Sequence, residues 1–371
     1  QHSELVRINM LLSNINNSQI ENLKLIIKEN NNKLVIVSPY LADDMKLFLD
    51  NFDFSLVKTI ELITTFKPRD IEQISKPYQL KDFFEYFNDK YPNVTSKIHV
   101  CNSLHGKLYF SISKRKELII TSSNFTVNGM FNNEEWGVRI NDDSIVEQAL
   151  DEVYGVIEYP DVTYFQVKRA CQFAEVYSKK NPQWDNKPEV MYDILDSVYS
   201  DTDKDNKNPK YFLKPIGYKE DPVTLDEKRD FSKLHQNLHF SKKMPKSVKK
   251  GDVIITTAVG AGSLLSYFKV TSSIQMVTQE QIKNEPWAAR WPWFLEGKNN
   301  STEFGSKWWL YNLRRQDLLA EFREKYPSEP VTYAGGFTLG TINMGNDKVR
   351  LSEKFAKFLI SKIEECSVPV A

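Results

Sequence analysis

Leu104-His105-Gly106-Lys107-Leu108-Tyr109 is the most informative segment of this 371-residue sequence. Two further polar segments follow it, Thr121-Ser122-Ser123-Asn124-Phe125 and Asn133-Glu134-Glu135. Each adjoins an apolar run that is typical of a buried strand. Because residues i and i+2 of a strand point to the same face, each segment presents two polar side chains together. The six candidate site residues are His105, Lys107, Ser122, Asn124, Asn133 and Glu135.

Side chains of these types suit the hydrolysis of a phosphodiester. That reaction needs positive charge around the non-bridging oxygens, a nucleophile, and an acid for the leaving oxygen. A lone histidine beside a strand is more often a structural residue. The order and spacing of all three segments, taken together, favour a catalytic role.

The three segments resemble the signature of the phospholipase D superfamily, in which His-x-Lys precedes Ser-x-Asn and Asn-x-Glu. The match is close over residues 104–136 and loose over the surrounding pattern. In two respects the sequence departs from the full signature: Ile112 stands where an aspartate is expected, and the motif occurs once instead of twice. Single-motif versions without that aspartate look like the metal-independent restriction endonucleases of this superfamily, which join a catalytic domain to a C-terminal DNA-binding domain.

This resemblance implies a site shared by two chains of a homodimer. His105 of one chain would attack phosphorus and form a phosphohistidine, while His105 of its partner would protonate the leaving group. Lys107, Asn124 and Ser122 would hold the phosphoryl oxygens. Glu135 would orient a histidine through its second ring nitrogen. The scheme requires no cofactor and no metal ligand.

Up to about residue 160 the sequence has the rhythm of an α/β domain. Helices are expected at 17–30 and 80–91. The expected strands are 33–40, 57–66, 97–101, 106–113, 117–122 and 135–140. The resemblance implies that residues 1–160 form a mixed-sheet sandwich of the phospholipase D type. Residues 161–209 are predicted to be a helical connector followed by a polar linker.

Residues 210–371 are predicted to form a mainly-β pseudo-barrel with a closing helix at 352–365. The strand candidates in this part are 211–216, 252–259, 266–272 and 333–343. The pattern resembles the PUA-like barrels of the EVE and ASCH types, which bind nucleic acid or modified bases. A B3-like barrel, the DNA-reading partner in restriction enzymes of the superfamily, is the rival interpretation.

Two features of this C-terminal part favour contact with nucleic acid. Five of the seven tryptophans lie within the 23 residues 287–309, and tryptophan can stack on an exposed base. Five lysines fall within the nine residues 242–250, where they can meet phosphates. A tryptophan-rich core and a solvated lysine face are the ordinary alternatives. The candidate DNA-binding residues are Trp287, Arg290, Trp291, Trp293, Lys242, Lys243 and Lys246.

The net charge of zero conceals an uneven distribution. Residues 1–165 carry 17 basic and 23 acidic side chains, a balance of −6, whereas residues 166–371 carry 32 basic and 26 acidic side chains, a balance of +6. Such a division by halves is typical of a polyanion-binding module joined to another domain.

Other patterns in the sequence bear on cellular location, membrane contact and the use of ATP. The three cysteines are too few and too scattered for a disulfide framework, which favours a reducing, cytoplasmic location. No apolar stretch approaches 18 residues and no signal-peptide pattern is present, so no membrane contact is expected, although the start at Gln1 leaves open that residues precede it. Because no Walker-type loop occurs, any ATP-driven step would need a separate helicase or ATPase partner.

The sequence therefore predicts a dimeric, metal-independent DNA endonuclease of a restriction or anti-phage system, whose C-terminal domain reads a sequence or a modified base. Two alternatives remain, a phospholipase D-like lipid phosphodiesterase and an RNA-directed nuclease. The single motif and the basic C-terminal half disfavour the lipid substrate. RNA stays open because phosphohistidine chemistry does not use the 2′-hydroxyl.

Overall fold

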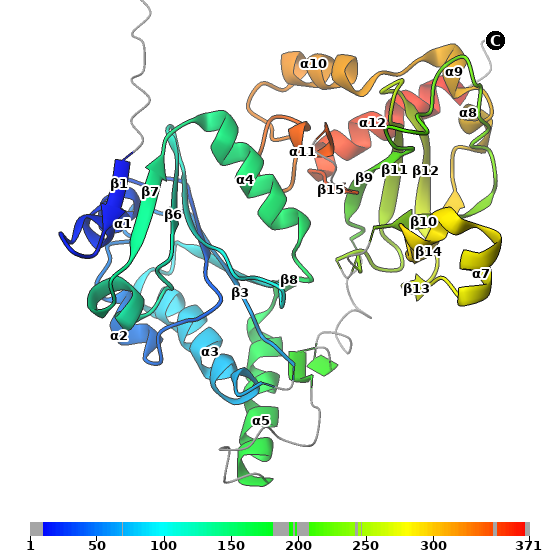
Figure 1. The fold of residues 1–371 in the computed structure, drawn as a ribbon. Helices are drawn as coiled ribbons and strands as arrows, with labels where there is room; N and C mark the ends of the chain where they lie inside the picture. Colours follow the sequence, from blue (N-terminus) through cyan, green and yellow to red (C-terminus); the bar gives the residue numbers. More distant parts are fainter. Residues whose placement is uncertain are drawn as a thin grey trace, which may run out of the picture. The chain divides into compact units, whose positions relative to one another are not determined.

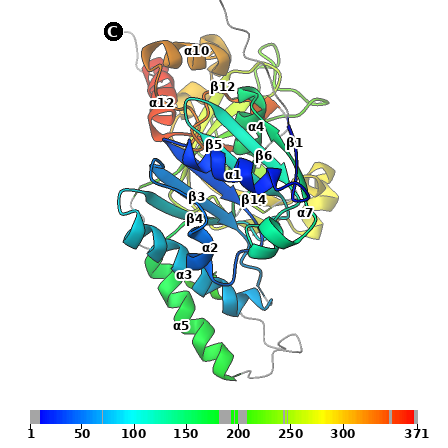
Figure 2. The same cartoon turned by 90° about the vertical axis from the view of Figure 1, so that its left-hand side faces the viewer.

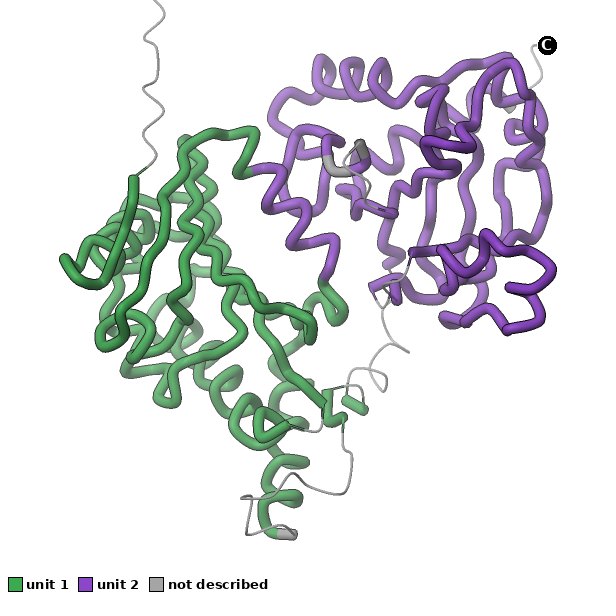
Figure 3. Tube along the Cα trace, in the orientation of Figure 1, with its two compact units in different colours: residues 1–146, 157–206 green, residues 147–156, 207–371 purple. Residues whose placement is uncertain are grey.

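The computed structural model describes residues 10–68, 70–180, 193–195, 197–198, 208–241, 244–245, 247–343 and 347–367. The chain divides into two compact units, which Figure 3 colours separately. Unit 1 comprises residues 1–146 and 157–206, and unit 2 comprises residues 147–156 and 207–371. The division falls inside helix α4 (Asp143–Gly155), most of which belongs to unit 2.

Unit 1 is built on one mixed sheet of eight strands, in the order β1-β7-β6-β5-β2-β3-β4-β8 (Figure 1). Its strands are β1 (Met10–Ser13), β2 (Lys33–Val37), β3 (Thr59–Thr64), β4 (Thr95–Val100), β5 (Lys107–Ile112), β6 (Lys116–Thr121), β7 (Trp136–Ile140) and β8 (Tyr159–Val162). The pairs β2–β3 and β3–β4 are parallel, and the other neighbours are antiparallel. The mixed α/β architecture that the sequence predicted for this part is confirmed.

Helices cover one face of this sheet, as Figure 2 shows. They are α1 (Ser18–Lys28), α2 (Met45–Leu49), α3 (Glu72–Lys90) and α5 (Tyr164–Lys180). Each contributes to a single apolar core, for example through Ile26, Phe48 and Phe83. Leu34 and Ile36 of β2 point into the same core, as the alternation of a strand requires.

Unit 2 contains a second sheet, in the order β10-β14-β12-β11-β9-β15, with β13 paired to β14. Its strands are β9 (Tyr211–Ile216), β10 (His235–Phe240), β11 (Val253–Ala258), β12 (Leu264–Val270), β13 (Gln275–Met276), β14 (Trp293–Asn299) and β15 (Val349–Arg350). Besides most of α4, the helices of unit 2 include α7 (Gln279–Asn284), η3 (Pro286–Ala289), α8 (Thr302–Gly305), α9 (Trp308–Tyr311), α10 (Arg315–Lys325), α11 (Gly340–Asn343) and α12 (Glu353–Ser367). The α12 helix packs on one face of the sheet through Phe355 and Leu359.

The sheet of unit 2 is curled but open. On its other face Phe212 of β9 and Phe240 of β10 belong to one core cluster, although these two strands are not neighbours in the sheet. Lys214 Nζ lies 4.3 Å from the centroid of the Phe240 ring. Nevertheless β10 and β15 end the strand order, and no described pairing joins them. The predicted pseudo-barrel is therefore not confirmed, and neither is its PUA-like or B3-like character.

The closing helix predicted at 352–365 is confirmed as α12. The strand predicted at 333–343 is wrong, because this segment forms turns and the short helix α11. Among the described residues, no helix has the length and apolar character needed to cross a membrane.

Candidate active site

The candidate residues of unit 1 lie at one end of three adjacent strands. Strand β5 begins at Lys107, which pairs with Thr121 at the end of β6, and Thr121 in turn pairs with Gly137 near the start of β7. The segments that precede β5, follow β6 and precede β7 therefore emerge at the same edge of the sheet. These segments contain His105, Ser122 to Asn124, and Asn133 to Glu135.

Hydrogen bonds bring three of the candidates together directly. Ser122 Oγ donates to a carboxylate oxygen of Glu135, and Asn133 Nδ2 donates to the other oxygen at 3.3 Å. The backbone holds the same pair of segments, because Ser122 N donates to Trp136 O at 3.0 Å and Trp136 N donates to Ser122 Oγ at 3.2 Å. The Glu135 carboxylate is thus occupied by Ser122 and Asn133.

His105 and Lys107 lie at this edge, where the Lys107 ammonium supplies positive charge. His105 is exposed and Lys107 is half-buried. Across the described part of the chain, neither side chain forms a hydrogen bond or an ion pair, so the Glu135 carboxylate does not contact His105 within one chain. Both side chains are therefore available to a ligand from outside the chain.

Asn124 has an unused hydrogen-bonding group. Its Oδ1 atom is buried and has no hydrogen-bond partner. Leaving such an atom unpaired costs about 1–3 kcal/mol, which a ligand can recover by supplying a partner. The Oδ1 atom can therefore accept a hydrogen bond from a ligand, whereas a phosphoryl oxygen would have to bind to the Nδ2 group of the same amide.

Neighbouring residues hold the turn that carries Asn124. Tyr109 Oη donates to Ser123 O at 2.9 Å, and Ser123 Oγ donates to Gly129 O at 2.6 Å. Gly129 belongs to η1 (Asn128–Asn132), a single turn of π-helix, and a Cβ atom at this position would lie 2.5 Å from Asn124 O. Turns of π-helix are frequent at functional sites.

These supporting residues were not predicted from the sequence. Tyr109 is buried, and both its burial and the charge of Glu135 raise the pKa of its hydroxyl, which stays protonated and donates to the turn. It lies two residues after Lys107 on the same strand face, so the alternation that singled out Lys107 also contained this signal. Gln19 bonds to Ser123 and Thr121 from α1, and no local sequence signal indicates that contact.

In unit 2, three of the predicted DNA-binding residues form an aromatic group. The Arg290 guanidinium lies 4.9 Å from the Trp291 ring and 5.1 Å from the Tyr218 ring. Trp287 lies 6.5 Å from Trp291 and 4.8 Å from the ring of His239. Tyr218 and His239, which come from distant positions in the chain, were not predicted as members of this group.

The other candidates of unit 2 lie elsewhere. Trp293 is the first residue of β14 and packs against the core cluster of the curled sheet. The fully buried Trp308 is also a core residue. Lys242, Lys243 and Lys246 fall outside the described residues. Within the described ranges, no group of three or more His, Cys, Asp or Glu side chains is arranged to hold a metal ion.

No family model matches the chain, and neither does any curated protein. Among solved structures, NucT from Helicobacter pylori is 15% identical, with 42% of this chain and 99% of that chain covered and a TM-score of 0.30. Nuc from Salmonella typhimurium, described as a phospholipase D family member, is 12% identical, with 42% and 99% covered and a TM-score of 0.32.

Yeast tyrosyl-DNA phosphodiesterase 1 is also similar, at 12% identity, with 57% of this chain and 53% of that chain covered and a TM-score of 0.25. All three identities are below 25% and all three TM-scores are below 0.5. At these levels the similarities carry no conclusion about function.

Proposed function

We propose that this chain is a phosphodiesterase of the phospholipase D type that cleaves DNA, as in restriction or anti-phage systems. One observation carries the proposal. At a single edge of the unit 1 sheet, His105 and Lys107, which form no hydrogen bond or ion pair with the described residues, accompany Asn124, whose amide nitrogen can donate to a phosphoryl oxygen, and the bonded pair Ser122 and Glu135. These groups match the needs of an anionic ester under nucleophilic attack.

The proposed reaction has two balanced steps. First, a ring nitrogen of one His105 attacks phosphorus, the P–N bond forms as the bond to the leaving oxygen breaks, and a protonated second His105 gives its proton to that oxygen. Next, water attacks the phosphohistidine and loses a proton to the second His105. The P–N bond breaks, and both histidines return to their starting states.

This scheme needs two histidines, and one chain offers His105 once. A second copy of the chain supplies the other. On the face of the sheet that lies opposite the core of α1, α2, α3 and α5, an apolar row gives that copy a contact surface, because Leu11 of β1 pairs with Val138 of β7 and Val138 pairs with Ile120 of β6. Leu11 is 76% exposed and the adjacent Trp136 is 49% exposed. Exposed apolar side chains next to a half-site favour a partner surface there.

Unit 2 would select the target. The C-terminal half of the sequence carries the excess of basic side chains, which favours general affinity for the phosphate backbone. The aromatic group of Trp287, Arg290 and Trp291 offers stacking surface for a base, and Trp287 is 42% exposed. We therefore assign to unit 2 the recognition of a DNA sequence or of a modified base.

Cleavage of plasmid DNA in the presence of EDTA tests the proposal. We expect the full chain to nick plasmids in the chelator and His105→Ala to abolish the activity, because the scheme uses side chains alone. His235→Ala, which changes an exposed histidine of β10, is the matched control and should cleave normally. Plasmids of differing methylation in the same assay test the role of unit 2.

Three results would contradict the proposal. Loss of cleavage in EDTA that magnesium restores would contradict the mechanism. Hydrolysis of phosphatidylcholine vesicles without cleavage of DNA would instead favour the lipid alternative, and cleavage of RNA alone would favour the RNA-directed nuclease.

A further inference from the structure

The candidate edge of the sheet extends beyond the three predicted segments. Val37 at the end of β2 pairs with Leu108 of β5, so the loop after β2 lies beside the segment that carries His105. Strand β3 is parallel to β2, and its following loop leaves the sheet at the same edge. Tyr40 lies in the first of these loops and Lys67 in the second.

The loop that carries Tyr40 is fixed to the turn that carries Asn124. Phe125 N donates to Ser38 Oγ at 2.9 Å, and Ser38 Oγ donates to Tyr40 O at 2.7 Å. A β-bridge joins Leu41 to Phe125. Tyr40 and Asn124 therefore have a defined spacing, which is what a substrate-binding residue near a catalytic group requires.

Two buried side chains, Lys76 and Thr65, hold the same loop through hydrogen bonds to its backbone. Lys76 Nζ donates to Pro39 O at 2.7 Å, and Thr65 Oγ1 donates to the same oxygen at 2.8 Å. Because Lys76 is only 2% exposed, it stabilises the loop and is not available to a ligand at the surface. In contrast, Tyr40 is 47% exposed although its backbone is fixed.

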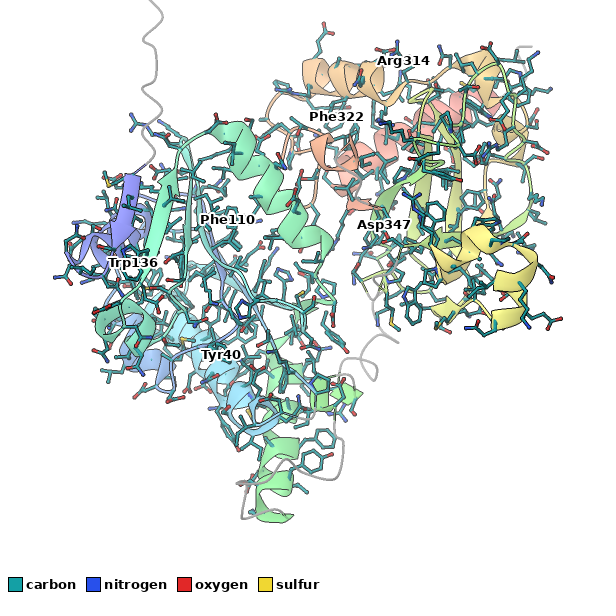
Figure 4. The ribbon with its side chains drawn as sticks, viewed as in Figure 1. Tyr40, Phe110, Trp136, Arg314, Phe322 and Asp347 are labelled. Carbon is teal, nitrogen blue, oxygen red and sulfur yellow. The ribbon has the colours of Figure 1, made fainter. Side chains whose placement is uncertain are left out.

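The loop that carries Lys67 is fixed to the segment that leads to His105. Phe66 N donates to Asn102 Oδ1 at 3.0 Å, and Asn102 precedes His105 by three residues. Lys67 N donates to the buried carboxylate of Glu72 at 3.0 Å. The Lys67 ammonium lies 5.8 Å from the centroid of the Tyr40 ring. In Figure 4, Tyr40 and Trp136 lie toward the same end of the strands, and Phe110 lies farther along them.

We propose that Tyr40 and Lys67 form a nucleotide subsite beside the scissile phosphate, in which Tyr40 stacks on an unpaired base and Lys67 contacts the adjacent phosphate. This inference rests on the proposed function and names its substrate, a single-stranded or locally opened nucleic acid. A planar, exposed ring next to a cation matches the alternation of bases and phosphates along such a strand. A glycerolipid offers no planar group for the ring.

The test measures the cleavage and the binding of a fluorescent single-stranded oligonucleotide by the full chain. We expect Tyr40→Ala to raise KM and Kd about tenfold, as loss of one stacked base predicts, with kcat nearly unchanged. Tyr40→Phe keeps the ring and should behave like the wild type. Lys67→Gln should weaken binding and lower the slope of log Kd against log salt by about one unit.

Tyr78→Ala is the control, because this tyrosine of α3 is similarly exposed but bonds to Cys171 O in α5. If cleavage depends on His105 while Tyr40→Ala leaves KM and Kd unchanged, the subsite is wrong and the proposed function stands. If the wild type cleaves no phosphodiester, the proposed function fails. The binding arm still decides the subsite in that case, since equal Kd values for wild type and Tyr40→Ala overturn it.

Discussion

Asn124 depends on a glycine that lies outside the predicted motif. A Cβ atom at Gly129 would meet Asn124 O at 2.5 Å and Asn124 N at 2.9 Å, and backbone atoms cannot rotate away as a side chain can. Gly129→Ala should therefore displace the Asn124 turn and reduce kcat/KM for phosphodiester cleavage, on the order of 10²-fold for a shift near 1 Å. Steady-state kinetics on a variant with unchanged circular dichroism measures the effect.

Gly340→Ala is the matched control for that substitution. At Gly340, the first residue of α11, the nearest atom to an added Cβ is Thr338 Oγ1 at 3.7 Å, an ordinary contact. Alanine should be neutral or mildly stabilising there. Full activity of Gly129→Ala would mean that the π-helical turn does not position Asn124.

The sequence predicted which residues gather at the edge but not what holds them. Alternation along a strand is a local property, so His105 and Lys107 could be assigned to one face before the structure was known. The Asn124 turn instead rests on Gln19, which is 104 residues from Ser123, and on the close approach of Gly129. Such contacts follow from tertiary packing, which no short window of sequence contains.

At the scale of elements, helix α4 carries a buried acid that makes unit 2 sensitive to pH. Asp151 is 3% exposed, and this burial raises its pKa to about 7, although Thr332 Oγ1 donates to it at 3.0 Å and acts in the opposite direction. In the unfolded chain the group titrates near pH 4. The contribution of Asp151 to stability is therefore fully present below about pH 4 and is lost as pH rises toward 7, by about 1.4 kcal/mol for each unit by which the two pKa values differ.

Asp151→Asn should remove this pH dependence. We expect its melting temperature to change less than that of the wild type between pH 5 and 8, because an amide does not ionise. Glu152→Gln alters an exposed acid of the same helix and should retain the wild-type slope. Equal slopes for the wild type and Asp151→Asn would show that another group controls the transition.

The elements of unit 2 were harder to predict than those of unit 1 for a physical reason. Central strands such as β2 are apolar along their length and stand out in any sequence. Strand β10 reads His-Gln-Asn-Leu-His-Phe and buries only Leu238 and Phe240, so its signal is weak. The segment 333–343 instead has an apolar pattern that predicts a strand where none forms, because its apolar residues pack in turns and in α11 and do not enter the sheet.

At the scale of the whole molecule, one chain holds half of the catalytic groups that the proposed reaction uses. His105 provides a nucleophile, but His99 near the end of β4 is fully buried and interacts with Glu61 at 3.3 Å, so it is not accessible to protonate the leaving oxygen. Glu135 is occupied by Ser122 and Asn133. Pairing of two chains through the apolar row that contains Leu11 would complete the site and cover exposed apolar surface in one step.

Mixed dimers test this pairing without disturbing the contact surface. Wild-type and His105→Ala chains with different tags are co-expressed at known ratios, and cleavage is measured per wild-type chain. Because a mixed dimer has one histidine, random pairing should reduce this activity to about one half at equal amounts and to about one tenth at a ninefold excess of the variant. Activity per wild-type chain that stays constant at every ratio would mean that each chain acts alone, and the shared site would be wrong.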